Sequence, residues 1–187
     1  MDTIVAIIAL VFLSPLMVII TVGIKCTSKG PIFYKQQRIG QKSTPFTVYK
    51  FRSMRVNNPA KHPDVTTVSD PRITAYGRFI RRHQLDKLPQ LWNVIKGDMS
   101  LVGPKPELEK YIQHHERLYR SILQVRPGMT DMAAILFKNE SRMLATYPDP
   151  EWAYTTVMLP KKIALYNAYI TNISFLKDMH IIFKTIV

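Results

Sequence analysis

The chain has 187 residues, enough for one domain with a sizeable core, and its 26 Lys and Arg against 13 Asp and Glu give a formal net charge of +13. This excess indicates an anionic partner: nucleic acid, a phospholipid surface or a phosphorylated substrate. The single Cys26 excludes an internal disulfide, and none of the five His stands in a zinc-binding spacing. No helix-turn-helix or RNA-recognition pattern supports a nucleic-acid partner, so none is expected.

An uncharged, apolar stretch opens the chain and runs from Thr3 to Ile24. A straight helix over this stretch would measure roughly 33 Å, about the thickness of the hydrocarbon core of a bilayer. A secretory signal is disfavoured, because no basic residue precedes the stretch and no small-x-small cleavage site ends it. We therefore predict a membrane-embedded helix over 1–25, followed by a globular domain over 26–187.

Ser14 and Pro15 lie at the middle of this stretch, where a proline removes a backbone donor and kinks a helix. One possible topology is a kinked helix that spans the membrane, which composition alone favours. The other is a re-entrant helix that bends at Ser14-Pro15 and leaves by the face it entered. Lys25, Lys29 and Lys35 follow closely, so either topology leaves the globular part in the cytoplasm by the positive-inside rule.

The remaining patterns predict a small α+β domain that is mostly helical. Two short strands over 32–38 and 46–51 are expected to form a hairpin, because turn residues separate them. The stretch 55–71 is polar and rich in Pro, Asn and Asp, which predicts a mobile loop. Helical patterning begins near Ile73 and recurs over 108–123, over 151–170 and from Ser174 onward.

Two of these helices have informative faces. Leu88, Leu91, Trp92 and Ile95 fall at helical spacing and predict one apolar face, with Gly97 as the C-terminal cap. The last helix is amphipathic and keeps its lysines away from its apolar face. Such a helix lies either on the membrane surface or against the domain core, and the pattern leaves both open.

A carboxylate that follows several cations is the first chemical signal. Asp86 comes after Arg78, Arg81 and Arg82, and Lys87 follows it directly. Cations near one acid suit a site that handles phosphates, because they neutralise phosphoryl oxygens while the acid attacks or binds a metal ion. By themselves, however, these residue types favour an ordinary helix N-cap at Asp86.

Four segments carry a family signature: 30–40 with 46–54, 76–107, 125–130 and 172–178. Together with the apolar start they resemble the bacterial sugar transferases, the monotopic polyprenyl-phosphate phosphoglycosyl transferases. The segments follow the family's order and cover nearly the whole chain, so the resemblance does not depend on one short motif. A Ser-Pro pair is also where the family's re-entrant helix breaks, which favours the re-entrant topology here.

The resemblance implies a reaction and a nucleophile. Family members transfer a phosphosugar from a UDP-sugar to undecaprenyl phosphate, with release of UMP and assistance from Mg²⁺, as the first membrane step of surface glycan synthesis. They work at the cytoplasmic face of the bacterial inner membrane. Asp86 stands at the position of the nucleophile, which forms a covalent phosphosugar-enzyme that the lipid phosphate then resolves. A carboxylate can split a difficult phosphoryl transfer into two easier steps.

Several cations match the family's phosphate-binding positions. Arg81 matches an arginine beside the nucleophile, where it would hold phosphate oxygens. Lys105 and Lys138 each stand where the family usually has an arginine, and the second of these is expected to contact the nucleotide. Lysine keeps the charge but loses the bidentate fork of arginine. Lys50 and Arg52 are further candidates for phosphate binding.

Lys87 departs from the family pattern, which has an Asp-Glu pair where this chain has Asp86-Lys87. The family glutamate is expected to help hold Mg²⁺ or handle a proton, and an ammonium at neutral pH does neither without a depressed pKa. Three explanations are open. Asp98 or another carboxylate completes a metal site with Asp86; Lys87 holds the phosphate as a point charge; or the chain is a catalytically impaired relative that binds polyprenyl phosphate or a partner at the membrane.

Overall fold

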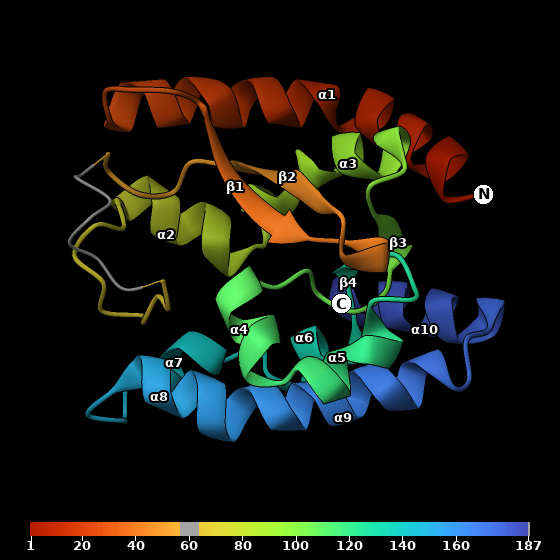
Figure 1. Ribbon diagram of the computed structural model, residues 1–187. Coiled ribbons are helices and arrows are strands. Elements are labelled where there is room, and N and C mark those ends of the chain that lie inside the picture. The colour runs from red at the N-terminus through yellow and green to blue at the C-terminus, as the bar shows by residue number, and fades with distance from the viewer. Residues whose placement is uncertain (57–63, 187) are drawn as a thin grey trace. The chain divides into compact units, whose positions relative to one another are not determined.

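The computed structural model describes residues 1–56 and 64–186, which form two compact units. The first unit holds residues 1–37, 47–56 and 70–97, and the second holds 38–46, 64–69 and 98–186. The helical elements of the first unit are α1 (Asp2–Thr27), α2 (Ala75–Arg82), the 3-10 turn η3 (Leu85–Lys87) and α3 (Gln90–Lys96) (Figure 1).

Helix α1 includes the whole apolar stretch and continues through Pro15. Pro15 has no N–H to donate to the carbonyl of Val11, and the hydroxyl of Ser14 donates to that oxygen instead, at 2.7 Å. The ribbon of α1 changes direction along its length (Figure 1), as a proline inside a helix predicts. Among the described residues, α1 is the one helix long and apolar enough to cross a membrane.

The core of the first unit forms around the C-terminal half of α1. Ile20 and Ile24 of α1 are buried with Phe51 of strand β2 (Pro45–Phe51) and Ile80 of α2. At Gly23 a Cβ atom would lie 2.3 Å from the ring of Tyr76, so only glycine lets that ring approach α1. The apolar segment is therefore also a packing partner of the residues that follow it.

Strands β1 (Phe33–Ile39) and β2 hydrogen-bond to each other, which confirms the predicted hairpin to within one residue at its ends. The short 3-10 turn η1 (Gln41–Ser43) connects them. Of the predicted mobile loop over 55–71, residues 57–63 lie outside the described residues.

The segment that leads into α2 is held in place on both sides. Met54 and Ile73 form an isolated antiparallel bridge, and the amide of Thr74 donates to the carbonyl of Ser53 at 3.2 Å. The hydroxyl of Thr74 accepts from the amide of Gly77 at 2.8 Å and so caps α2, as a threonine at this position is suited to do.

The predicted apolar face of α3 was partly wrong. Leu91 is buried, but Trp92 is 51% exposed, and the buried positions of α3 include Asn93 and Gln90. Asn93 is 0% exposed because its amide pairs with the backbone of β2, which makes a polar side chain the better choice for the interior. Gly97, at φ +83°, ends α3 in the left-handed conformation that the sequence predicts.

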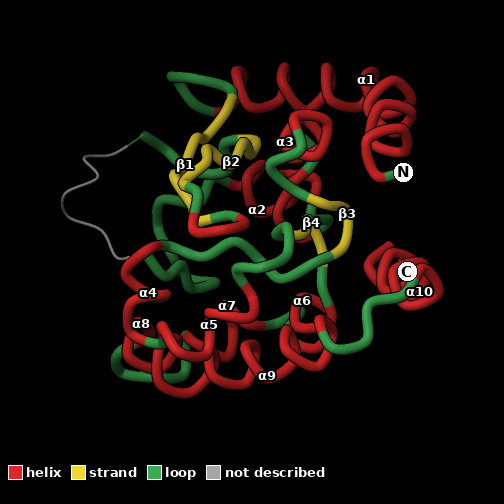
Figure 2. Tube along the Cα trace, turned by 45° about the vertical axis from the view of Figure 1, so that its right-hand side comes forward, coloured by secondary structure: helices red, strands yellow, loops and turns green. Residues whose placement is uncertain are grey.

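The second unit is mostly helical. One pair of short parallel strands lies in it, β3 (Ser100–Val102) and β4 (Gly128–Thr130), with Ser100 opposite Gly128 and Val102 opposite Thr130 (Figure 2). Its helices are α4 (Glu109–His114), α5 (Glu116–Ile122), α6 (Met132–Leu136), α7 (Glu140–Leu144), α8 (Pro150–Ala153), the π-helical turn η4 (Tyr154–Met158), α9 (Leu159–Ile170) and α10 (Phe175–Ile186).

The turn after β3 passes close to the start of β4 at two glycines, Gly103 and Gly128. A Cβ atom on Gly128 would lie 2.1 Å from the nitrogen of Gly103, and one on Gly103 would lie 2.7 Å from the carbonyl oxygen of Arg126. Any side chain at either position would therefore clash with backbone. This close approach fixes the start of the Gly-Pro-Lys-Pro turn that carries Lys105.

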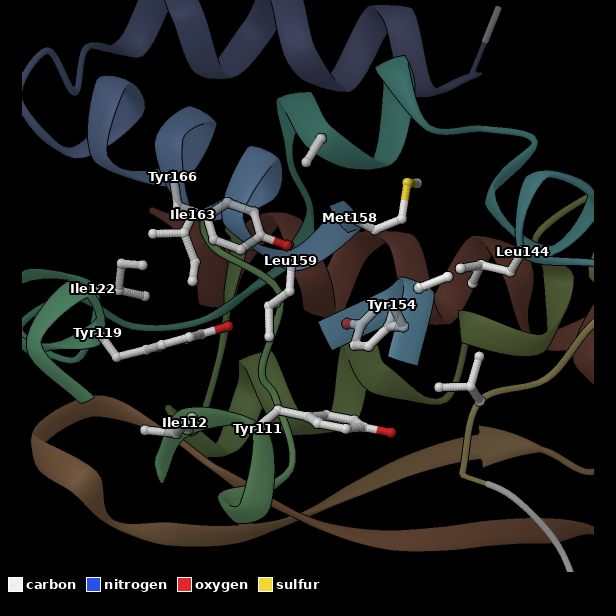
Figure 3. Packing of buried hydrophobic residues seen from close by; sticks show 13 residues of the cluster. Tyr111, Ile112, Tyr119, Ile122, Leu144, Tyr154, Met158, Leu159, Ile163 and Tyr166 are labelled. Atoms are coloured by element: carbon white, nitrogen blue, oxygen red, sulfur yellow. The ribbon is translucent and has the colours of Figure 1, made fainter. Parts of the chain in front are cut away.

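The core of the second unit is built from aromatic and branched residues of α4, α5 and the long helical run through α8, η4 and α9. Figure 3 shows Tyr111, Tyr119, Tyr154 and Tyr166 gathered around Leu159. The predicted helix over 108–123 is interrupted at His115, whose ring nitrogen Nε2 lies 3.0 Å from the carbonyl of Thr155.

The predicted fold class, α+β and mostly helical with an apolar N-terminal helix and a short hairpin, is confirmed. The last predicted helix is α10, and its hydroxyl-bearing Thr185 lies 2.7 Å, oxygen to oxygen, from Thr130 of β4. The division at residue 25 between a membrane segment and a cytoplasmic domain concerns placement relative to a lipid bilayer and stays a prediction.

Candidate active site

Asp86 lies in the short turn between α2 and α3. Helix α2 ends at Arg82, and Gln84 then takes a left-handed conformation with φ +55°, which is uncommon for a residue with a side chain. The chain re-enters helical geometry in η3, where Asp86 is partly buried. Strained backbone of this kind is retained where the surrounding structure holds it, commonly at functional sites.

The protonation of Asp86 depends on two opposing effects, its burial and the positive charge of nearby residues. Burial raises the pKa of the Asp86 carboxyl above its ordinary value, while Lys50, Lys87 and Arg81 act in the opposite direction. The carboxyl is therefore a more basic and less solvated group than an exposed aspartate, within an electropositive part of the first unit.

Arg81 lies in the last turn of α2 and is influenced by the charges of two acids. Burial lowers its pKa, and the charges of Asp86 and Asp70 oppose that shift. Asp70 is itself held by Arg72, whose Nε and Nη2 donate to the carboxylate at 2.9 Å and 2.6 Å. These contacts hold the pKa of Asp70 below its ordinary value, so a charged acid lies near Arg81 in addition to Asp86.

Lys50 is positioned through the strand that carries it. The amide group of Asn93 donates to the carbonyl of Thr47 at 2.7 Å, and its oxygen accepts from the amide of Tyr49 at 3.2 Å. Asn93 thus continues the hydrogen bonding of β2 from within α3. This pairing fixes β2, which carries Lys50, against the helix that follows Asp86.

Arg52, a predicted phosphate ligand, is buried in a backbone clamp. Its guanidinium donates to the carbonyl of Ser28 at 2.7 Å, to the hydroxyl of Ser28 at 2.9 Å and to the carbonyl of Lys29 at 3.1 Å. Gly30, at φ +122°, leaves no room for a side chain, because a Cβ atom would lie 2.3 Å from this guanidinium. These bonds hold the turn that leaves α1.

The ammonium of Lys87 is held by a residue earlier in the same turn. Its ammonium donates to the side-chain oxygen of Gln84 at 3.1 Å, which ties it to the left-handed residue before Asp86. Lys87 also contributes to the positive potential at Asp86. An ammonium fixed in this way suits phosphate binding as a point charge.

The remaining predicted residues belong to the second unit. Lys105 lies in the turn after β3, with its ammonium 3.8 Å from the carboxylate of Glu107. Lys138 is exposed just beyond α6, and Asp98 directly follows Gly97 and begins the longest segment of this unit. The structure thus brings Lys50, Arg81, Asp86 and Lys87 together in one unit, and it assigns Lys105, Lys138 and Asp98 to the other.

The family model described as bacterial sugar transferase matches residues 1–187, the full length of the chain. The chain belongs to the bacterial sugar transferase family. The resemblance found in the sequence motifs is therefore confirmed.

Relatives with assigned names support the same family. The UDP-glucose:undecaprenyl-phosphate glucose-1-phosphate transferase of Xanthomonas campestris pv. campestris is 39% identical over 191 residues, which cover 100% of this chain and 37% of that protein. A UDP-N-acetylgalactosamine-undecaprenyl-phosphate N-acetylgalactosaminephosphotransferase of Aeromonas hydrophila is 36% identical, with 100% of this chain and 42% of that protein covered. The exopolysaccharide production protein ExoY of Sinorhizobium fredii is 34% identical, with 99% and 81% covered. This chain spans less than half of the first two proteins.

The donor set of this bacterial sugar transferase is sparse for a metal ion. Among the described residues, no group of three or more His, Cys, Asp or Glu side chains is placed to hold one. Mg²⁺ is commonly bound by one or two carboxylates together with substrate phosphates. Asp86 is partly exposed and offers one such carboxylate, so the site fits Mg²⁺ that is held mainly by the diphosphate of a substrate.

Two parts of the site were missed from the sequence. Asp70 fell in the predicted mobile loop and Arg72 directly after it, although an acid two residues before an arginine is a recognisable local pair. Asn93 was hidden inside an apparently apolar helix, and a lone Asn among apolar residues is the signal that could have found it.

Proposed function

We propose that this chain transfers a phosphosugar from a UDP-sugar to undecaprenyl phosphate and releases UMP, through a covalent intermediate on Asp86. The observation that carries the proposal is the partly buried Asp86 carboxyl with Lys50, Lys87 and Arg81 in its electrostatic surroundings. The names of the relatives, which include undecaprenyl-phosphate sugar phosphotransferases, support the same substrates.

Two displacements at one phosphorus make up the reaction. In the first, a carboxylate oxygen of Asp86 attacks the sugar-bearing phosphorus, and the bond from that phosphorus to the bridging oxygen breaks, so that UMP leaves with the bond's electron pair. In the second, an oxygen of undecaprenyl phosphate attacks the same phosphorus. The acyl-phosphate bond then breaks, which restores the carboxylate and yields the lipid diphosphosugar.

The cations stabilise charge that develops during both steps. Arg81, Lys50 and Lys87 hold phosphoryl oxygens, and Lys105 and Lys138 are proposed to hold the phosphates and the nucleotide. Asp86, with Asp98 as the second candidate, would bind Mg²⁺. Bound together with the substrate diphosphate, Mg²⁺ would supply positive charge that offsets the charge developing on the leaving UMP. Asp86 must lose its proton before it attacks. Burial raises the pKa of its carboxyl and so makes the ionised carboxylate a more basic nucleophile.

The proposed location is the cytoplasmic face of the bacterial inner membrane, as part of a pathway for a surface glycan. Helix α1 supports membrane association, because it exposes large apolar side chains such as Phe12, which is 80% exposed. Helix α10 presents Leu176 and Phe183 to solvent, with Lys177 and Lys184 on the same helix. This combination suits a helix that lies at the surface of an anionic bilayer.

A release assay tests the proposal. Purified protein is incubated with Mg²⁺, undecaprenyl phosphate and a panel of UDP-sugars that includes N-acetylated and amino-deoxy sugars, and UMP is measured. We expect UMP release with at least one donor, loss of release in Asp86→Asn, and normal release in the control Glu116→Gln, which alters an exposed acid of α5. No UMP release with any donor contradicts the proposal.

A second candidate function follows from Lys87, which replaces the family glutamate. In that case the chain is an impaired relative that binds polyprenyl phosphate or a partner at the membrane. The substitution Lys87→Glu separates the two functions in the same assay. Release that appears only in Lys87→Glu supports the impaired relative, whereas release in the natural chain that falls in Lys87→Glu supports a phosphate-binding Lys87.

A further inference from the structure

The ammonium of Lys105 is held by charge but keeps its hydrogen-bond donors available. Lys105 is 40% exposed, and its Nζ atom lies 3.8 Å from Oε1 of Glu107, which is too long for a hydrogen bond. The ring of Tyr154 lies below it, with its centroid 5.9 Å from Nζ. Over the described part of the chain these are the contacts of the ammonium, so its N–H groups can donate to an anionic ligand.

Glu107 is fixed far more firmly than Lys105. It is 1% exposed, yet Oε2 accepts from Nη1 of Arg38 at 3.1 Å, and Oε1 accepts from the hydroxyl of Tyr154. Its backbone carbonyl also accepts from the amide of Ile39 at 3.1 Å. Burial raises the pKa of Glu107, but Lys105 and Arg38 outweigh that effect and hold the pKa below its ordinary value. Glu107 is therefore a charged and immobile acid.

Tyr154 connects this acid to the helical core. It is the first residue of the π-helical turn η4, a rare geometry that recurs at functional sites. Figure 3 shows its ring among the core residues of the second unit. The ammonium of Lys162 lies 5.0 Å from the centroid of the same ring and pairs with Glu140. Both the ring and the hydroxyl of Tyr154 are thus constrained.

This arrangement matters because lysine is a flexible ligand. A lysine side chain carries about 2 kcal/mol of rotamer entropy, and it lacks the planar fork with which arginine fixes a phosphate. A buried acid that attracts the ammonium from beyond hydrogen-bond distance restricts the side chain without occupying its donors. Attraction of this kind also opposes proton loss from Lys105, so the group stays cationic.

We propose that Glu107, locked by Tyr154, is a positioning residue that fixes the Lys105 ammonium where it binds a phosphate of the substrate. The inference rests on the proposed function, because it takes Lys105 to be a phosphate ligand. Glu107 itself touches no reacting atom and acts through Lys105. The substitution Glu107→Gln keeps the size of the side chain and an acceptor for Tyr154, but it removes the charge that attracts the ammonium.

A double-mutant cycle tests the proposal. UMP release is measured for the natural chain, Glu107→Gln, Lys105→Met and the double variant, all confirmed as folded by circular dichroism. We expect Glu107→Gln to lower kcat/KM about tenfold in the natural background and to have no further effect in Lys105→Met. The control Glu109→Gln, at an exposed acid of α4, should leave kcat/KM unchanged.

A purely structural role for Glu107 predicts a different pattern, in which Glu107→Gln lowers kcat/KM equally in both backgrounds, and that result overturns the proposal. If Glu107→Gln does not fold, Tyr154→Phe replaces it in the cycle, with the same expected loss of effect in Lys105→Met. The same variants are also titrated with UDP. A chain that binds UDP without releasing UMP contradicts the proposed function, while the Kd values still decide whether Glu107 acts through Lys105.

Discussion

The substitution Asn93→Leu tests how the first unit holds its candidate catalytic residues. Asn93 is fully buried, and its amide satisfies the carbonyl of Thr47 and the amide of Tyr49 on β2. Leucine has a similar volume but leaves both backbone groups without these partners. Because each buried polar group left unsatisfied costs about 1–3 kcal/mol, we expect the free energy of unfolding to fall by about 3 kcal/mol.

This loss is large enough to measure by thermal unfolding. For a chain of this size, 1 kcal/mol shifts the unfolding temperature by roughly 2–4 °C, so Asn93→Leu should lower it by about 9 °C. The assay is circular dichroism of the detergent-solubilised protein. UMP release should also fall at temperatures where the variant is folded, because β2 carries Lys50.

A matched control uses the same chemical change at an exposed site. Asn139 precedes α7, and its side chain makes no capping hydrogen bond, so Asn139→Leu should change the unfolding temperature little. If Asn93→Leu unfolds within about 2 °C of the natural chain, the reasoning that a buried amide fastens α3 to β2 is refuted.

Three further predictions concern pH and topology. Because burial raises the pKa of Asp86 and the nucleophile must be ionised, UMP release should fall as pH is lowered, with a midpoint above the ordinary aspartate value of 3.8. The same shift means that ionised Asp86 costs stability above that value, so Asp86→Asn should raise the unfolding temperature at about pH 7 and match the natural chain at about pH 4; equal unfolding temperatures at both pH values contradict it. Pro15→Ala should straighten α1 and favour a spanning topology, which is read by maleimide labelling of Asp2→Cys in a Cys26→Ser background. In intact spheroplasts the label should reach position 2 only in the Pro15→Ala chain, and labelling of both chains would exclude the re-entrant topology.

Features that depend on local chemistry were predictable from the sequence. The uncharged stretch to Ile24 predicts α1, and the residues around Gly40 predict the hairpin. Gly97 ends α3 in the left-handed conformation that only glycine adopts freely, so its role follows from its identity. In each case the signal and the structure lie within a few residues of each other.

Features that depend on contacts distant in sequence were not predictable in this way. The spacing of Leu88, Leu91, Trp92 and Ile95 predicts a face that is purely apolar, but the strand edge of β2 requires a polar partner, and Asn93 provides it. Strands β3 and β4 are too short for an alternating pattern to appear. Their pairing brings Gly103, just after β3, against Gly128, the first residue of β4, a close approach that needs glycine at both positions.

The residues of the candidate site also fall into those that a local motif predicts and those that depend on distant contacts. Asp86 and Arg81 were found because a motif places them five residues apart, on the last turn of one helix and the turn that follows. Asp70 influences Arg81 only after the chain folds back, which no local pattern reveals. Arg52 carries the expected charge, but only the structure shows that its guanidinium hydrogen-bonds to the turn after α1.

The most direct test of the account is mass spectrometry of the protein after incubation with UDP-sugars in the absence of undecaprenyl phosphate. Without the lipid acceptor, the covalent intermediate should accumulate. The account predicts the added mass of a phosphosugar on the peptide that contains Asp86, its disappearance when undecaprenyl phosphate is added, and its absence in Asp86→Asn. Two results contradict the assignment of Asp86 as the nucleophile. One is an adduct that persists in Asp86→Asn. The other is formation of UMP and lipid diphosphosugar with no adduct on that peptide.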